Sequence, residues 1–153
     1  MKALVDNQRG TSAVEMAIVS PLLVMFIFGI IEFGLLFYNK AMITNASREA
    51  ARAGIVYGDP YLNVPQIRDV AIKYLTRDDG KSMLVSFGSG SGPDPQVPSG
   101  ECADHGQELV VNVIYHYEFL LLPDFLTAFF TEGEPSGLPG SIDISTETRM
   151  RCE

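Results

Sequence analysis

The sequence is short of several residue types that common functions need. Its 153 residues include no tryptophan, two cysteines and two histidines, and 11 Lys and Arg residues stand against 19 Asp and Glu residues. The net charge of −8 argues against nucleic-acid binding, because no excess of basic side chains is available to neutralise phosphates. Cys102 and His105 have a Cys-x2-His spacing, but no second pair lies nearby, so we predict no zinc site.

Patterns typical of catalysis are also missing. The sequence has no phosphate-binding loop of the Gly-x4-Gly-Lys-Ser/Thr type, no nucleophile elbow and no catalytic cluster, so we predict neither an enzyme nor a cofactor. Acidic residues such as Asp78, Asp79 and Asp94 stand beside turns, where they are usually solubilising, and calcium binding is a weaker alternative.

Charge is nearly absent from one long segment. Between Glu15 and Lys40 the only formally charged residue is Glu32. About 20 apolar residues are needed to cross the roughly 30 Å hydrocarbon core of a bilayer, and this segment reaches that length. We therefore predict a transmembrane helix over residues 11–38, which Pro21 bends near its start.

The helical pattern continues beyond the apolar segment. Residues 39–57 are rich in alanine and contain no proline, so we expect the same helix to extend outside the membrane. A carboxylate at membrane depth costs several kcal/mol unless it is paired or protonated. From the residues alone, Glu15 and Glu32 are expected at the headgroup depths of the two interfaces.

Residues 58–153 carry six basic and fifteen acidic residues and read as a small α+β domain. Pro65 opens a second helix with Asn63 near its N-cap, and its apolar stripe ends at Leu75 before the stop at Gly80. Period-two alternation predicts three strands of an antiparallel sheet, over residues 83–87, 109–119 and 142–151. Residues 88–100 and 133–140 have loop composition, and the apolar stretch 120–130 is expected either to pack on the sheet or to contact another subunit or the membrane.

The two cysteines, Cys102 and Cys152, are most simply read as a disulfide in an oxidising compartment, tying the long loop to the last strand. Two free thiols or an intermolecular bridge remain the alternatives.

The segment before the apolar run reads Gln8-Arg-Gly-Thr-Ser-Ala-Val-Glu15, after a short net-positive leader that ends at Gly10. This arrangement resembles the class III signal of type IV pilins and pseudopilins. Three further matches extend the resemblance to the TadE-like minor pseudopilins of tight-adherence (Tad/Flp) pilus systems. They are Pro21-Leu-Leu, Phe28-Gly-Ile-Ile-Glu-Phe-Gly34 and Thr44-Asn-Ala-Ser-Arg-Glu-Ala-Ala-Arg-Ala-Gly54. Met16 departs from the phenylalanine that is usual after the glutamate.

The resemblance implies removal of leader residues 1–10 by a prepilin peptidase that cuts between Gly10 and Thr11. It also implies a pilin-like fold in the bacterial inner membrane, with the amino end cytoplasmic. Residues 58–153, which we call the body, would then lie outside. The new amine of Thr11 would pair with Glu15 of a neighbouring subunit, which removes two unfavourable charges together.

The partners implied are the prepilin peptidase, the major Flp pilin, a second (TadF-like) minor pseudopilin, the inner-membrane assembly platform and the lipid bilayer. The pilus would serve adhesion and biofilm formation. Three other functions or topologies remain open: a single-pass membrane-anchored extracytoplasmic binding module, a plain membrane anchor, and a conventional secretory signal peptide. The last has a shorter apolar core than this one.

Overall fold

A computed structural model of the chain describes residues 2–58, 60–86, 92–119 and 140–153, and the described side chains begin at residue 10. Its elements follow one another as α1 (Lys2–Ile55), α2 (Val64–Leu75), β1 (Asp94–Gln96), β2 (Glu108–Glu118) and β3 (Ser141–Arg151). The predicted α+β class, with a long N-terminal apolar helix, a second helix and a three-stranded antiparallel sheet, is confirmed.

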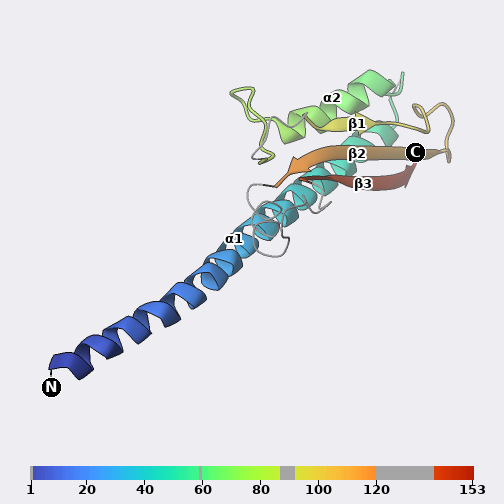
Figure 1. Cartoon of the computed structure of the whole chain (residues 1–153). Helices are drawn as coiled ribbons and strands as arrows, with labels where there is room; N and C mark the ends of the chain where they lie inside the picture. The colour runs from blue at the N-terminus through green and yellow to red at the C-terminus, as the bar shows by residue number, and fades with distance from the viewer. Residues whose placement is uncertain (1, 59, 87–91, 120–139) are drawn as a thin grey trace.

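Helix α1 dominates the shape of the molecule. Its 54 residues give a rod of about 80 Å at 1.5 Å per residue. Its N-terminal half extends away from the rest of the chain, whereas its C-terminal part lies along the sheet and α2 (Figure 1). The helix continues through Pro21 and ends at Ile55, close to the predicted end at residue 57.

Helix α2 begins where the sequence predicts. The Asn63 side chain accepts a hydrogen bond from the Gln66 N–H, and the Gln66 side chain accepts one from the Asn63 N–H, both at 3.0 Å. This capping box satisfies two backbone donors that the first turn of a helix leaves without a partner. Its apolar stripe then buries Ile67, Ala71 and Leu75 against α1.

The sheet has the order β1-β2-β3, with both pairs antiparallel. Strands β2 and β3 pair over their full length, from Glu108 opposite Arg151 to Glu118 opposite Ser141. The predicted alternation of β2 is confirmed, because alternate side chains are buried against α1. They are Leu109, Val111, Val113, Tyr115 and Tyr117.

The strand predicted over residues 83–87 was wrong for residues 83–86, and Phe87 lies outside the described residues. Asn39 of α1 explains the difference. Its Nδ2 donates to the Val85 carbonyl at 2.6 Å, and its Oδ1 accepts from the Val85 N–H at 2.9 Å. The backbone of Val85 is therefore satisfied by a helix side chain. The Met83 N–H donates to the Leu75 carbonyl at 2.8 Å, and Thr76 and Ser82 form an isolated β-bridge.

The remaining strand, β1, falls inside the segment that was read as a loop. Pro95 lacks the N–H that a central strand needs, but β1 is an edge strand, where proline is tolerated. The Pro95 side chain is fully buried, and the residue pairs with Val113. Period-two reasoning missed this strand because three residues are too few to alternate. The apolar stretch 120–130 and all but the last residue of the loop 133–140 lie outside the described residues.

The core forms where α1 meets the sheet and α2, and small residues allow the close approach. Ala46, Ala50 and Ala51 of α1 are fully buried there. Gly54 shows the tightest fit: a Cβ atom at this position would lie 2.6 Å from Leu109 Cδ2 and 3.0 Å from Ile67 Cδ1. The inward-facing residues of the alanine-rich segment 44–54 are thus small, which lets the sheet and α2 pack closely against α1.

We expect Gly54→Val to lower the stability of the body by about 1–3 kcal/mol, because the added methyl groups overpack this contact. The measurement is the thermal unfolding midpoint of the full chain in detergent. Gly34→Val is the matched control, since a Cβ at Gly34 meets nothing within 4 Å. Equal midpoints for the two variants would contradict the close-packing explanation.

Candidate functional site

Most side chains in the apolar half of α1 are exposed. Phe26 is 70% exposed and Ile30 is 72% exposed, and none of the apolar window that qualifies as a membrane span is buried inside the structure. The core helix of a soluble protein would instead bury such side chains. Among the described residues, α1 is the one helix long and apolar enough to cross a membrane, and it fits a single-pass membrane anchor.

The predicted processing junction lies inside this helix. Gly10 and Thr11 belong to the continuous run of α1, and both are exposed. A Cβ atom at Gly10 would meet nothing within 4 Å, so the fold itself does not require glycine there. Glycine weakens a helix interior by roughly 0.5–1 kcal/mol relative to alanine, which favours local opening of the backbone at this bond.

Glu15 lies four residues after Thr11, so the two residues share one face of α1. It is exposed, and no ion pair joins it to the described side chains. The structure thus places the predicted Glu15 carboxylate on the helix surface, within reach of a neighbouring chain.

Glu32 has a different setting from Glu15. It is only 3% exposed and lies where the body first covers α1. The Tyr117 hydroxyl donates to the Glu32 backbone carbonyl at 3.4 Å, and Tyr117 itself is fully buried. Burial raises the pKa of the Tyr117 phenol above its ordinary value of 10.0, and the nearby Glu32 carboxylate raises it further. Glu32 therefore lies at the junction of helix and sheet, which spacing along the sequence could not show.

Asn39 is a site residue that sequence reasoning missed. It lies seven residues after Glu32 on the same face of α1, is fully buried, and makes the two hydrogen bonds to Val85. Together the two polar side chains mark the side of the helix that the body covers. A signal was present in the sequence: two polar residues at helical spacing in an otherwise apolar segment indicate a face directed toward protein.

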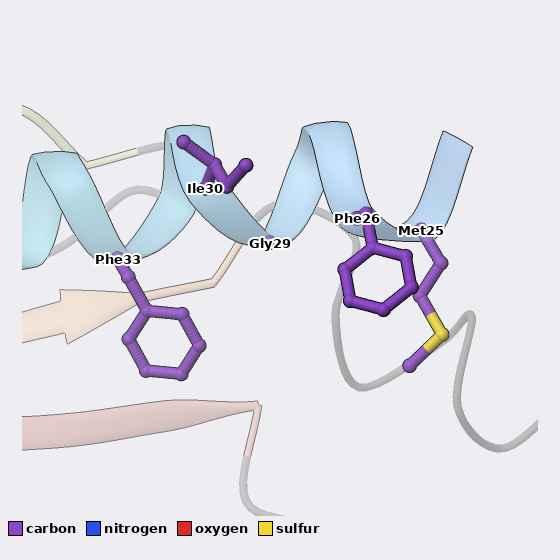
Figure 2. Close-up of a pocket in the computed structure, with 5 residues that line it drawn as sticks. All are labelled: Met25, Phe26, Gly29, Ile30 and Phe33. Atoms are coloured by element: carbon purple, nitrogen blue, oxygen red, sulfur yellow. The ribbon is translucent and has the colours of Figure 1, made fainter. Parts of the chain in front are cut away.

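An apolar hollow of about 360 Å³ borders α1 within the exposed segment, lined by Met25, Phe26, Gly29, Ile30 and Phe33 (Figure 2). The described side chains that line it are all apolar, so they offer nothing to orient a polar substrate. Gly29 lies between the larger side chains, and a Cβ there would meet nothing within 4 Å. The chemistry of this hollow suits a lipid chain or an apolar helix.

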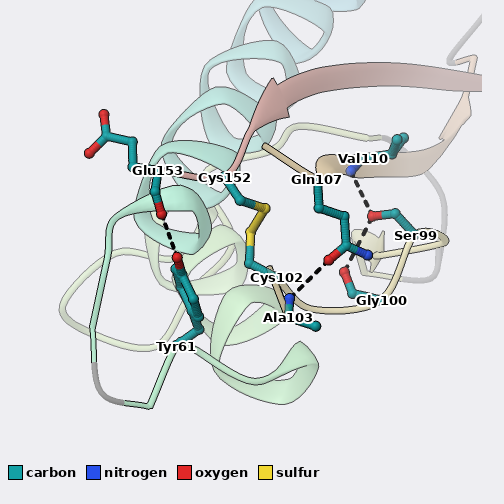
Figure 3. Close-up of a disulfide and its surroundings, with 9 residues drawn as sticks. All are labelled: Tyr61, Ser99, Gly100, Cys102, Ala103, Gln107, Val110, Cys152 and Glu153. Atoms are coloured by element: carbon teal, nitrogen blue, oxygen red, sulfur yellow. Dashed lines mark hydrogen bonds between the residues drawn. A yellow bond between two sulfur atoms is a disulfide. The ribbon is translucent and has the colours of Figure 1, made fainter. Parts of the chain in front are cut away.

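The predicted disulfide between Cys102 and Cys152 is confirmed, with Cα atoms 6.0 Å apart and a sequence separation of 50 residues. Backbone hydrogen bonds reinforce it: the Cys152 N–H donates to the Gln107 carbonyl at 2.8 Å, and the Gly106 N–H donates to the Cys152 carbonyl at 2.9 Å. Figure 3 shows the Gln107 side chain accepting from the Ala103 N–H, at 2.9 Å. The loop that carries Cys102 is thereby held firmly to the last strand.

The same connection reaches α1. The Glu153 N–H donates to the carbonyl of Ile55 at 3.1 Å, and the Tyr61 hydroxyl donates to the Glu153 carbonyl (Figure 3). The end of β3 is therefore fastened both to the long loop and to the C-terminal end of α1.

Replacing both cysteines, as Cys102→Ser with Cys152→Ser, should lower the free energy of unfolding by about 2–4 kcal/mol, because the unfolded chain regains the freedom of the closed loop. Thermal unfolding of the full chain measures this. Reducing agent should bring the wild type to the midpoint of the double variant and leave that variant unchanged. Equal midpoints for the oxidised wild type and the double variant would show that the bridge is dispensable.

The residues weighed for metal binding or catalysis have other roles. Cys102 is bonded to Cys152 and is not available as a zinc ligand beside His105. His116 contacts Asp143 across the outer face of the sheet, with 2.6 Å between Nδ1 and Oδ1. Within the described part of the chain, no group of three or more His, Cys, Asp or Glu residues is placed to hold a metal ion.

Comparison with known proteins gives one family match. Residues 10–52 match the family described as TadE-like protein, which confirms for this segment the resemblance found in the sequence. The match begins at Gly10 and includes Glu15, Glu32 and most of the alanine-rich segment, but covers less than half of the chain. No curated protein and no solved structure matches. The family is one of pilus structural components rather than enzymes, and it indicates a component associated with a Tad pilus.

Proposed function

We propose that this chain is a minor pseudopilin required for assembly of a tight-adherence pilus, and that a prepilin peptidase cuts it after Gly10. The observation that carries the proposal is the family match over residues 10–52, on a helix whose apolar part is fully exposed. The unneeded glycine at position 10 adds support: the fold does not require it, whereas a peptidase that reads glycine would.

In this proposal residues 1–10 are the leader and the residues after Gly10 form the mature chain. The body covers one side of α1 from Glu32 onward, so we place the outer edge of the bilayer near that residue on that side. From Thr11 to Ile31 the helix then measures about 31 Å, close to the roughly 30 Å of a hydrocarbon core. Phe37 is 67% exposed on the uncovered side, where it can still reach the interface. Residues 58–153 form the domain outside the membrane.

Redox chemistry supports the proposed orientation. Disulfides persist in oxidising compartments and are rare in the cytosol, so the Cys102–Cys152 bridge suits a body on the periplasmic or extracellular side. The amino end, with Lys2 and Arg9 in the leader, then lies in the cytoplasm, where the peptidase acts. In the native system the partners are the peptidase, the major pilin, a second minor pseudopilin and the assembly platform.

After cleavage the Thr11 amine would be a positive charge at the membrane interface. Glu15 is exposed on the same helix face, and a neighbouring subunit's Glu15 can neutralise that amine. The pairing is directional, because each subunit gives an amine to one neighbour and a carboxylate to another. Such contacts produce an open helical assembly rather than a closed ring.

Cleavage is tested directly by the mass of the protein purified from its native membrane. We expect a mature chain beginning at Thr11, and the full-length chain in a strain that lacks the peptidase. An intact Met1, or a cut far from Gly10, would contradict the pseudopilin assignment. The rival function, a membrane-anchored binding module, predicts an uncut chain in both strains.

We expect Glu15→Ala and Glu15→Gln to leave cleavage largely intact but to reduce pilus formation by roughly tenfold or more. A charge-assisted pair contributes about 1.5–3 kcal/mol, and 1.4 kcal/mol corresponds to tenfold. The measurement is the amount of sheared pili when each variant is the sole copy. Glu49→Gln, an exposed acid on the same helix, is the matched control. Normal pilus yield with Glu15→Gln would refute the charge pairing.

A further inference from the structure

One face of α1 outside the membrane is left uncovered by the body. Ala41, Asn45, Arg48 and Arg52 are all exposed, and their spacing of four, three and four residues places them along one side of the helix. We call these four residues the arginine stripe. It lies opposite the face that buries Ile43, Ala46 and Ala50 in the core.

The charges of the stripe are not paired within the part of the chain that the structure describes. Neither Arg48 nor Arg52 forms an ion pair with any described residue, whereas Arg68 contacts Asp94 and Arg149 contacts Glu147. Two like charges four residues apart slightly destabilise an isolated helix. Glu49, exposed on the adjoining face, pairs with neither arginine among the described side chains. Arg52 lies in the last turn of α1, where a cation interacts favourably with the helix dipole, but Arg48 lies before that turn and has no such explanation.

Lipid headgroups are too distant to be the missing partner. If the bilayer ends near Glu32, Arg48 lies about 25 Å further along the helix at 1.5 Å per residue. That is several times the Debye length of about 8 Å at physiological salt. Two outward-facing cations at this distance from the bilayer suit an acidic surface of another protein.

The chain itself carries such a surface. Residues 92–119 contain five acidic residues and no lysine or arginine, although Asp94 already contacts Arg68 and Glu108 contacts Arg149. Two of the five, Glu101 and Asp104, are exposed on the loop that the disulfide holds, and Asp104 takes no part in the ion pairs of the described residues. This loop is preorganised by the hydrogen bonds around Cys152 and Gln107, so little freedom is lost when it docks.

The arginine stripe and the acidic loop also lie at similar positions along the axis of α1. Arg48 and Arg52 lie in the last two turns of α1, and the acidic loop is tied to the end of the same helix through Cys152 and the Glu153–Ile55 hydrogen bond. Two copies anchored side by side in one bilayer, with parallel helices, would thus bring the stripe of one level with the loop of the other.

We propose that the arginine stripe binds the acidic loop Glu101–Glu108 of a second copy of this chain. The contact joins different surfaces on the two copies, so each copy keeps one free stripe or one free loop for the next. This inference rests on the proposed function, since it names the neighbour that the helix of a pilus subunit would meet above the membrane.

The test uses the full chain in lipid nanodiscs or detergent, with two differently labelled copies whose association is followed by energy transfer. Arg48→Glu with Arg52→Glu should weaken association about tenfold or more, and high salt should weaken the wild type. The matched control is Arg77→Glu with Lys81→Glu, two exposed basic residues after α2 that change the net charge equally. Thermal unfolding of each variant confirms that the body stays folded.

Charge exchange and cross-linking identify the surface that the stripe meets. Asp104→Lys in one copy should restore binding to the Arg48→Glu, Arg52→Glu copy by about tenfold. A photo-reactive side chain at Asn45 should cross-link to residues 101–108 of another copy. Cross-links to lipid, to a different protein or to another part of the body would overturn the inference. So would equal association of the wild type and the Arg48→Glu, Arg52→Glu variant. Failure of cleavage at Gly10 would instead overturn the proposed function, because association of the purified full chain needs no processing.

Discussion

The structure depends on one constraint: a single helix exposes apolar side chains over its first half, as a membrane anchor does, and packs against the sheet and α2 over its second. A helix can do both because all its interior backbone hydrogen bonds are made within itself. The side chains decide which environment each part meets. Bulky apolar residues such as Phe26 and Ile30 remain exposed in the first half, whereas alanines and Gly54 in the second allow β2 and α2 to approach the helix axis. The change occurs near Glu32, the first charged residue after the apolar segment and the first that the body buries.

Local patterns predicted those parts of the fold whose causes are local. The apolar length of α1, the capping residues at Asn63 and Gln66, and the alternation from Leu109 to Tyr117 all act between residues close in sequence. The strand expected at residues 83–87 failed for a non-local reason. Asn39, more than 40 residues earlier, supplies the hydrogen bonds that a neighbouring strand would have supplied to Val85. Likewise β1 exists because the edge of β2 accepts a short partner, a property of the assembled sheet that the composition around Pro95 does not reveal.

The residues of the candidate site also fall into two groups: those that local spacing predicts, and those whose surroundings depend on the folded structure. Gly10, Thr11 and Glu15 are predicted from their spacing along one helix and stay predictions, whereas the disulfide favoured for the only two thiols, Cys102 and Cys152, is present in the structure. Glu32 was found as an unusual acid, but its burial beside Tyr117 depends on where the sheet docks. The arginine stripe could be recognised only from the structure. Arg48 and Arg52 lie in the same segment as Ala50 and Gly54, and only the docked body shows which of these residues face inward and which face outward.

The positions of the contacts that join the body to α1 also suit a subunit of a filament. At the membrane end, the body is joined to α1 by hydrogen bonds from Tyr117 and Asn39, which can open and re-form. At the far end, a covalent bridge and the Glu153–Ile55 hydrogen bond close the long loop, β3 and α1 together. In the proposed function, a subunit that leaves the bilayer would exchange lipid for neighbouring helices along its first half, and the contacts near Glu32 would meet that change of surroundings. The distal end keeps the same aqueous surroundings throughout, and a rigid acidic loop there can serve as a fixed docking surface.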